Sequence, residues 1–299
     1  MSKVVPLEKL REFVAPGQTV GLGGAWMSNH PMAAVRELIR AGLDELHVVD
    51  SLASIDIDLL VGAGLVRELT FSMVSLEAFG LAPHFRRAVQ DGSLQINEIS
   101  GVALNVALDA GAHNVPFLPM AELGGSQLPE MCPSGYRSVT CPFTGERLLA
   151  VRAINPDVAL IHVRRADEEG NCQVDGPLAS DPELARAAKR VVITCEELVS
   201  RADIAATPEL THIPGFLVHA VIEAPFGAHP TTHVPCYGFD AWSIMEYADV
   251  CAEGGGPEYI ARLQTETEAD YRARVLDDER RAVLGSIAGH ARTLDGVFA

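Results

Sequence analysis

The stretch TVGLGGAWMSNHPMAAVRELIRAG, from Thr19 to Gly42, decides how this chain is expected to fold. It begins with a short apolar run and a glycine-rich turn, and it continues as an amphipathic segment from Met32 to Arg40. Pro31 just before that segment and Gly42 just after it are typical of the start and the end of a helix. The stretch therefore predicts a strand, a loop and a helix.

The same alternation continues downstream. Further strands are predicted at Leu46–Val49, Glu68–Val74 and Leu94–Ile99, and helices at Leu81–Gln90 and Val102–Ala112. Strands that alternate with helices favour an α/β fold with an open, mostly parallel sheet flanked by helices.

A segment rich in proline and glycine, residues 116–145, interrupts this pattern and contains one apolar strand at Phe117–Met120. Buried-type strands then resume at Asp157–Val163, Arg190–Thr194 and Phe216–Ile222. Residues 240–299 are expected to form a helical C-terminal extension, because 257–263 and 266–275 have a helical period. With no internal repeat and no long linker, the chain is expected to form a single domain over residues 1–299.

Composition narrows the classes of function. The 299 residues carry a formal net charge of −17, which disfavours nucleic acid and anionic lipid as partners. No run approaches the roughly 18 apolar residues of a membrane span, and no export signal is visible, so we expect a cytoplasmic protein that does not enter membranes. Its six cysteines are scattered, and we expect no disulfides.

Three local motifs suggest chemistry that the residues around them do not support. Gly21–Gly24 resembles a dinucleotide loop, but the third glycine of that motif would fall on Trp26, so a plain strand-to-helix turn remains the alternative. His229, His233 and Cys236 have a metal-like spacing, but the adjacent prolines preclude a regular helix, and we expect no metal site. Cys195 precedes two glutamates that would raise its pKa, which favours a buried structural thiol over a nucleophile.

Polar residues near predicted strand ends form the best candidate site, because ligands of open α/β sheets bind at the carboxyl ends of the strands. Ser75 and Glu77 follow one strand, Glu98 closes the next, and Gly125 and Ser126 follow Phe117–Met120. Each of these residue types, taken alone, is more often a helix cap or a surface polar group than a binding residue.

Several segments together resemble the A-type (alpha) subunit of glutaconate CoA-transferase and its relatives, the family I CoA-transferases. The longest is PDVALIHVRRADEEGN at Pro156–Asn171; others are Asn114–Pro119, Cys141–Phe143, Val192–Glu197 and Val221–Pro230. The match extends along nearly the whole chain. Ala25 departs from the family pattern, where an aromatic residue follows the two glycines.

This resemblance implies a NagB/RpiA-like α/β fold and an acyl-CoA substrate, with coenzyme A as the carrier. It also implies a B-type (beta) partner in a heterodimer or heterotetramer. In the family the nucleophilic glutamate belongs to the B-type chain, where it attacks the thioester and passes through anhydride and glutamyl-CoA intermediates. No equivalent motif is visible in this chain, where Glu98 is the one candidate for a catalytic group. The acyl pocket is expected at Gly24, Ser28, Ser75, Glu77, Glu98, Gly125 and Ser126.

Three chemistries share the resembled scaffold, and the fold does not choose among them. We expect CoA transfer on a short or dicarboxylic, glutaconate-like acyl group. The alternatives are decarboxylation of a glutaconyl-type CoA and hydrolytic ring cleavage in steroid breakdown. The hydrolase subunits resemble this chain at Val74–Leu76 and Thr267–Tyr271, but they carry an extra acidic residue where this chain has Ser100 and Gly101. A non-catalytic scaffold subunit is the alternative from another class.

Overall fold

The computed structural model describes residues 2–295. Its main sheet is built from strands that pair in parallel. In spatial order these are β12 (Ala220–Glu223), β10 (Val191–Leu198), β8 (Val158–Ala166), β1 (Thr19–Leu22), β2 (Leu46–Ala53), β3 (Val66–Val74) and β4 (Gln95–Glu98). Two short strands, β9 (Cys172–Gln173) and β11 (Thr211–Ile213), add antiparallel pairs beyond β8. The predicted mostly parallel α/β sheet is confirmed.

The order of the strands reverses between β1 and β8. From β1 the chain proceeds outward through β2, β3 and β4, whereas from β8 it proceeds in the other direction through β10 and β12. Loops that leave neighbouring strands at such a reversal diverge to opposite faces and open a crevice, which is where open α/β sheets bind ligands. The residues that follow β1 therefore occupy the position where a ligand is expected.

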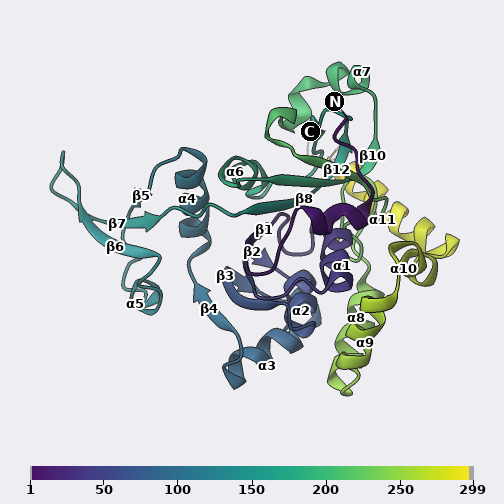
Figure 1. Cartoon of the computed structure of the whole chain (residues 1–299), viewed down its shortest axis with the longest axis horizontal. Helices are drawn as coiled ribbons and strands as arrows, with labels where there is room; N and C mark the ends of the chain where they lie inside the picture. Colours follow the sequence, from purple (N-terminus) through teal and green to yellow (C-terminus); the bar gives the residue numbers. More distant parts are fainter. Residues whose placement is uncertain (1, 296–299) are drawn as a thin grey trace.

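Helices cover both faces of this sheet (Figure 1). One face packs against α1 (Met32–Ala41) and α2 (Ile55–Gly62). The helices α3 (Pro83–Asp91), α8 (Ala241–Ala252) and α9 (Gly256–Thr265) pack against these two and one another in the same hydrophobic core. The other face packs against α4 (Gly101–Ala112) and α6 (Asp181–Ala187). Each face of the sheet has its own hydrophobic core, and alternate residues of a strand point into one core or the other. In β8, Leu160 packs into the core on the first face and Ile161 into the core on the second. Both neighbours are apolar and buried, as expected for a central parallel strand.

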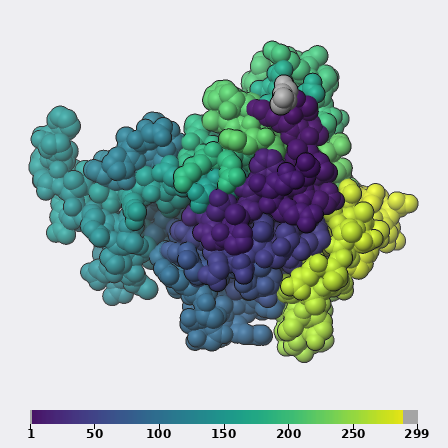
Figure 2. Space-filling model, in the orientation of Figure 1, coloured from purple at the N-terminus to yellow at the C-terminus, as the bar shows by residue number. Residues whose placement is uncertain are grey.

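The segment rich in proline and glycine forms a second, antiparallel sheet, which the sequence did not predict as a unit. Its strands, in spatial order, are β5 (Phe117–Met120), β7 (Arg147–Arg152) and β6 (Tyr136–Thr140), with α5 (Leu128–Met131) between β5 and β6 in the chain. Pro119 is tolerated in β5 because this strand lies at the edge of the sheet. Figure 2 shows this segment projecting from the body of the molecule.

The C-terminal region is helical, as predicted. After α8 and α9 come α10 (Glu268–Val275) and α11 (Asp278–Asp295). Arg36 of α1 anchors α10: its Nε donates to Glu268 Oε2 at 2.8 Å and its Nη1 donates to the carbonyl of His229 at 2.9 Å. Position 1 and positions 296–299 of the predicted domain and extension lie outside the described residues.

One predicted strand is wrong over most of its length. Phe216–Ile222 was expected to be extended, but Gly215–Leu217 forms a 3-10 turn, η4, and β12 begins only at Ala220. Pro214 precedes this turn, and Gly215 is held from both sides: its N–H donates to Asn171 Oδ1 and its carbonyl accepts from Lys3 Nζ. Phe216 consequently points outward and is 84% exposed.

The remaining elements are α7 (Arg201–Ala206) and 3-10 turns at Leu7–Glu12, Glu77–Phe79 and Pro208–Leu210.

Within the described residues, no two of the six cysteines are joined in a disulfide. Within residues 2–295, no helix combines the length and the apolar character needed to cross a membrane.

Candidate functional site

The loop at residues 23–30, called here the Gly24 loop, leaves the carboxyl end of β1 at the strand reversal. Gly24 has φ +90, a backbone conformation that L side chains rarely adopt. A Cβ atom at this position would lie 2.7 Å from the backbone of Ser28, Asn29 and His30. The loop therefore folds back on itself tightly, and only glycine fits where it turns.

Asp181 holds this loop from the other half of the chain. Its Oδ1 accepts a hydrogen bond of 2.9 Å from the backbone N–H of Gly24. A Cβ atom on the neighbouring Gly23 would lie 2.7 Å from the same oxygen, so both glycines are needed for this approach. Burial raises the pKa of Asp181 to about 7, although the hydrogen bond from Gly24 opposes the shift. Sequence reasoning missed Asp181, because Ser180, Asp181 and Pro182 look like an ordinary helix start.

The backbone of the Gly24 loop is largely satisfied by the protein itself. The N–H groups of Gly23, Ala25 and Trp26 donate to the carbonyls of Leu160, Ser28 and Leu52. Ser28 differs, because its buried Oγ has no hydrogen-bond partner among residues 2–295. The loop can therefore form a rigid wall with one free hydroxyl, but it offers few free backbone donors to an oxyanion.

Three other predicted site residues lie at the same edge of the main sheet. Ser75 follows β3, and its N–H donates to the carbonyl of Ala53 at the end of β2. Its Oγ accepts from the N–H of Glu77, an exposed residue with φ +55. Glu98 is half-buried, ends β4 and pairs with Phe71. Gly24, Ser28, Ser75, Glu77 and Glu98 thus follow or end parallel strands at one edge, and their role in binding stays a prediction.

Gly125 and Ser126 lie elsewhere. They follow β5, which belongs to the second sheet, so the expectation that this loop shares the carboxyl edge of the main sheet is wrong. Both residues are exposed, and Ser126 Oγ accepts from the N–H of Leu128 at the start of α5. Apolar strands look alike in sequence, and the pattern did not show that this one joins a different sheet.

The hollow beside the Gly24 loop is small. Gly24, Ser51, Ser180 and Asp181 line a cavity of about 10 Å³ together with leucines and Val49. That volume holds about one water molecule, whereas pockets for small ligands have on the order of 300 Å³ or more. The edge is therefore an open wall in this chain, and a deep pocket there requires a second surface.

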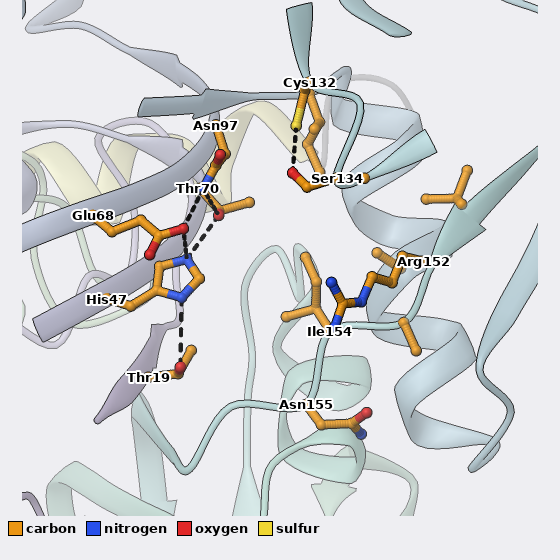
Figure 3. A pocket seen from close by; sticks show the side chains of 15 residues that line it. Thr19, His47, Glu68, Thr70, Asn97, Cys132, Ser134, Arg152, Ile154 and Asn155 are labelled. Carbon is orange, nitrogen blue, oxygen red and sulfur yellow. Dashed lines mark hydrogen bonds and ion pairs between the residues drawn. The ribbon is translucent and has the colours of Figure 1, made fainter. Parts of the chain in front are cut away.

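A larger cavity of about 360 Å³ lies between the main sheet and β7 (Figure 3). It lies over the start of β1 at Thr19, near the start of β2 at His47, over the middle of β3 at Thr70 and near the end of β4 at Asn97. Figure 3 shows Arg152 extending toward it from the opposite side.

The polar row in this cavity is already paired. His47 Nε2 lies 2.8 Å from Thr70 Oγ1, and Asn97 Nδ2 donates to Glu68 Oε1 at 2.6 Å. Burial lowers the pKa of His47, so its imidazole favours the neutral form. Because these groups pair with one another and the cavity meets β1 at its amino end, the Gly24 loop at the strand reversal is the stronger candidate for the ligand site.

A fully buried cluster of ionisable groups lies behind the Gly24 loop. His30 belongs to the loop, Asp50 to β2 and Asp56 to α2. Burial lowers the pKa of His30, but Asp56 outweighs this effect and the pKa is raised. Burial and the neighbouring Asp56 raise the pKa of Asp50 well above its ordinary value. Sequence reasoning missed this cluster, because metal-like motifs are visible in a sequence only through local spacing.

The rejected motifs have structural roles. His229 lies between Tyr271 Oη at 2.9 Å and Asp240 Oδ2 at 3.0 Å, and His233 Nδ1 donates to Asn29 Oδ1. Burial raises the pKa of Cys195 to about 12, and Glu223 and the adjacent Glu196 add to the shift, which agrees with the interpretation as a buried structural thiol.

Residues 6–224 match a family model described as coenzyme A transferase. The A subunit of 3-oxoadipate CoA-transferase from Pseudomonas knackmussii is 39% identical over 227 residues, covering 75% of this chain and 79% of that protein. The cholesterol ring-cleaving hydrolase IpdA subunit of Mycobacterium tuberculosis is 32% identical over 270 residues, covering 87% and 92%. An uncharacterized protein of Archaeoglobus fulgidus is 38% identical over 85% of this chain, but the match spans only 57% of that relative's length.

Two solved structures share the fold. Glutaconate coenzyme A-transferase from Acidaminococcus fermentans superposes with a TM-score of 0.88 at 28% identity, covering 95% of both chains. The decarboxylase AibA/AibB superposes with a TM-score of 0.81 at 31% identity, covering 89% of this chain and 100% of that chain. The similarity therefore includes relatives named for transfer, hydrolysis and decarboxylation.

Proposed function

The chain belongs to the coenzyme A transferase family, and we propose that it serves as the A-type subunit of an enzyme that transfers coenzyme A between short or dicarboxylic, glutaconate-like acids. The observation that carries this proposal is the Gly24 loop, a rigid wall at the strand reversal that contains no activated nucleophile. Ser28, Ser75, Glu77 and Glu98 would complete that wall on the side of this chain. Gly125 and Ser126 would contribute only if the second sheet reaches the acyl group in the assembled enzyme.

A B-type partner chain supplies the nucleophile in this proposal. The carboxylate of a partner glutamate attacks the thioester carbonyl, forms an acyl anhydride and releases coenzyme A as a thiolate. The thiolate then attacks the glutamyl carbonyl, releasing the first acid and leaving a glutamyl thioester. The acceptor acid repeats the two steps in reverse order. Two factors support this division of labour: Cys195 is buried with a raised pKa, and the hollow at Gly24 is too small to hold an acyl group.

The residues of this chain position the substrate in this scheme. The tight fold of the Gly24 loop and its bond to Asp181 fix one wall of the acyl pocket, so little motion has to be suppressed when the substrate binds. The Ser28 hydroxyl is buried and has no hydrogen-bond partner among the described residues, so it would donate to a polar group of the acyl chain after rotating out of the loop. Glu98 is half-buried at the same edge, and it is the candidate for a charged contact with the substrate.

Hydrolysis and decarboxylation remain the alternatives, as two of the relatives are named for these reactions. One feature weighs against the hydrolase reaction. Ser100 accepts a hydrogen bond from the N–H of Ala103 and so caps α4, and Gly101 begins that helix without a side chain. No carboxyl group follows Glu98 there to move a proton at the substrate.

The assembly would be a heterodimer or heterotetramer in the cytoplasm, with each chain of this type folding as one domain. The open carboxyl edge supports the need for a partner, since a second chain would close the pocket. A-type subunits among the relatives support the same organisation.

The direct test is to assay the B-type partner with and without this chain, using glutaconyl-CoA as donor and acetate as acceptor. Transfer that requires both chains and falls at least about tenfold in Glu98→Gln or Ser75→Ala supports the proposal. Full transfer by the partner alone would make this chain a scaffold. Carbon dioxide released without an acceptor acid would instead show decarboxylation. Cleavage of a ring carbon–carbon bond in a cyclic β-keto acyl-CoA, with the thioester intact, would show the hydrolase reaction.

A further inference from the structure

Three side chains behind the Gly24 loop aim one atom each at a common point. His30 Nδ1, Asp50 Oδ2 and Asp56 Oδ2 all lie within 4.8 Å of one another. His30 Nδ1 is 2.9 Å from Asp56 Oδ2 and 3.9 Å from Asp50 Oδ2. None of the three side chains is accessible to solvent. These separations are those of donors that surround one small cation at about 2 Å each.

The other polar atom of each side chain is fixed by the backbone. Asp50 Oδ1 accepts from the N–H of Leu52, and Asp56 Oδ1 accepts from the N–H of Ser54. His30 Nε2 lies 2.7 Å from the carbonyl of Trp26. A carbonyl can only accept, so Nε2 carries a proton, and Nδ1 faces the two carboxylates at 2.9 Å from Asp56 Oδ2 and 3.9 Å from Asp50 Oδ2. Orientation of each ligand through its second polar atom is typical of metal sites in proteins.

Among the described residues, the inward atoms of the three side chains face one another. His30 Nδ1 and Asp56 Oδ2 form one ion pair at 2.9 Å, whereas the buried Asp181 Oδ2 has no partner in the described part of the chain. Asp181 also acts electrostatically on both His30 and Asp50. One imidazole therefore faces three buried carboxyl groups, and a single ion pair does not neutralise them all, whereas one bound cation interacts with the whole set. Buried carboxylates are strongly disfavoured unless a positive charge accompanies them.

We propose that His30, Asp50 and Asp56 bind a divalent first-row transition metal ion, with Asp181 as the nearest further oxygen donor. One imidazole nitrogen combined with carboxylate oxygens suits Zn²⁺, Mn²⁺ or Fe²⁺. Ca²⁺ requires about six to eight oxygen ligands, which this set does not supply.

The ion would act as a structural clip. Its ligands come from the Gly24 loop, from β2 and from the first turn of α2, while Asp181 of α6 already holds Gly24. A bound cation would fasten the loop to two elements of the main sheet layer. Complete burial of the three ligands keeps the ion away from substrate, so the clip does not depend on the reaction proposed above.

The experiment measures metal content and stability rather than activity. The full-length chain, purified without chelators and dialysed against Zn²⁺ and in parallel against Mn²⁺, is analysed by elemental mass spectrometry and by thermal unfolding. We expect about one equivalent of one of these ions per chain. We also expect a melting temperature that falls with EDTA and recovers when the ion is restored.

Variants locate the ion. Asp50→Asn and His30→Gln preserve size and should bind at least about tenfold more weakly, with no response of the melting temperature to EDTA. Asp58→Asn is the matched control, since Asp58 is another buried aspartate of α2 and contacts Tyr247 rather than the cluster. Circular dichroism checks that each variant folds. The proposal is overturned if the wild-type chain binds less than about a tenth of an equivalent of either ion, or if a variant that carries both Asp50→Asn and His30→Gln retains full occupancy.

Discussion

Asp181 and Gly24 are 157 positions apart in sequence, yet the carboxylate of the first accepts the backbone N–H of the second at 2.9 Å. This bond joins the two halves of the sheet at the strand reversal. It ties the start of α6 to the loop that follows β1. The stability of the chain should depend on this hydrogen bond and on the glycine that permits it. It should also depend on buried ionisable groups elsewhere in the chain.

Removing the acceptor at position 181 should loosen the Gly24 loop. Asp181→Ala leaves a buried N–H unpaired, which costs about 1–3 kcal/mol, whereas Asp181→Asn keeps an acceptor oxygen and should cost less. Hydrogen exchange of the peptide that covers residues 21–30 measures the effect directly. Glu183→Ala, on the same helix, should leave that peptide unchanged; equal exchange in all three variants would show that the bond does not hold the loop.

Gly24→Ala should be far more damaging than an alanine at another glycine with positive φ. Gly17 has φ +78, and a Cβ atom there would meet no other atom within 4 Å, so Gly17→Ala incurs only the backbone penalty of about 1–2 kcal/mol. At Gly24 the same penalty is joined by contacts of 2.7 Å with backbone atoms that cannot rotate away. Urea unfolding of both variants measures the free energies, and similar losses would contradict the tight turn.

Stability should fall in mild acid because of His233. Burial lowers its pKa to about 3, and His162 adds to the shift, whereas an unfolded histidine titrates near 6.5. Between these values the unfolded chain binds a proton that the folded chain does not. The contribution of His233 to stability is therefore present above about pH 6.5 and decreases as the pH falls toward 3.

His233→Gln removes this contribution, so its unfolding free energy should depend less steeply on pH between 6.5 and 4.5 than that of the wild type. The limiting difference in slope is about 1.4 kcal/mol per pH unit. His113→Gln, at an exposed position, is the control and should behave as the wild type. Parallel pH profiles for His233→Gln and the wild type would show that His233 is not the acid-sensitive group.

The C-terminal helices should depend on one buried ion pair. The Arg36 side chain is 1% exposed and that of its partner Glu268 is 12% exposed, and the guanidinium also lies 3.9 Å from the ring centre of Tyr271. Glu268→Ala leaves a buried charge unpaired and should destabilise the chain by about 3–5 kcal/mol. The exposed pair of Lys9 and Glu12 provides the control, since Glu12→Ala should change stability by less than about 1 kcal/mol. Denaturant unfolding distinguishes the two.

Much of the main sheet could be predicted from local sequence. The apolar runs at 46–49, 68–74 and 157–163 became β2, β3 and β8, because central parallel strands bury both faces and read as continuous hydrophobic stretches. Ser75 and Glu98 were also correctly placed at the ends of neighbouring strands. These features depend on residues close together in the chain, where hydrophobic period and helix-end signals are informative.

The rest depends on contacts between distant segments. Nothing near Asp181 indicates that it meets Gly24, and nothing near Phe117–Met120 indicates that this strand joins a different sheet. His30, Asp50 and Asp56 converge only after β1, β2 and α2 have packed, so no spacing rule would find them. Contacts between segments that are far apart in the sequence therefore determine the features that the local sequence pattern did not predict.

The central claim is that this chain forms a wall of the acyl pocket while its partner supplies the nucleophile. The most direct measurement incubates the complex of this chain and its B-type partner with glutaconyl-CoA, traps the thioester intermediate with hydroxylamine or borohydride, and maps the modified residue by mass spectrometry. The account predicts a modified glutamate on the partner and an unmodified chain of the type described here. A covalent adduct on any residue of this chain, formed at the rate of turnover, would contradict it.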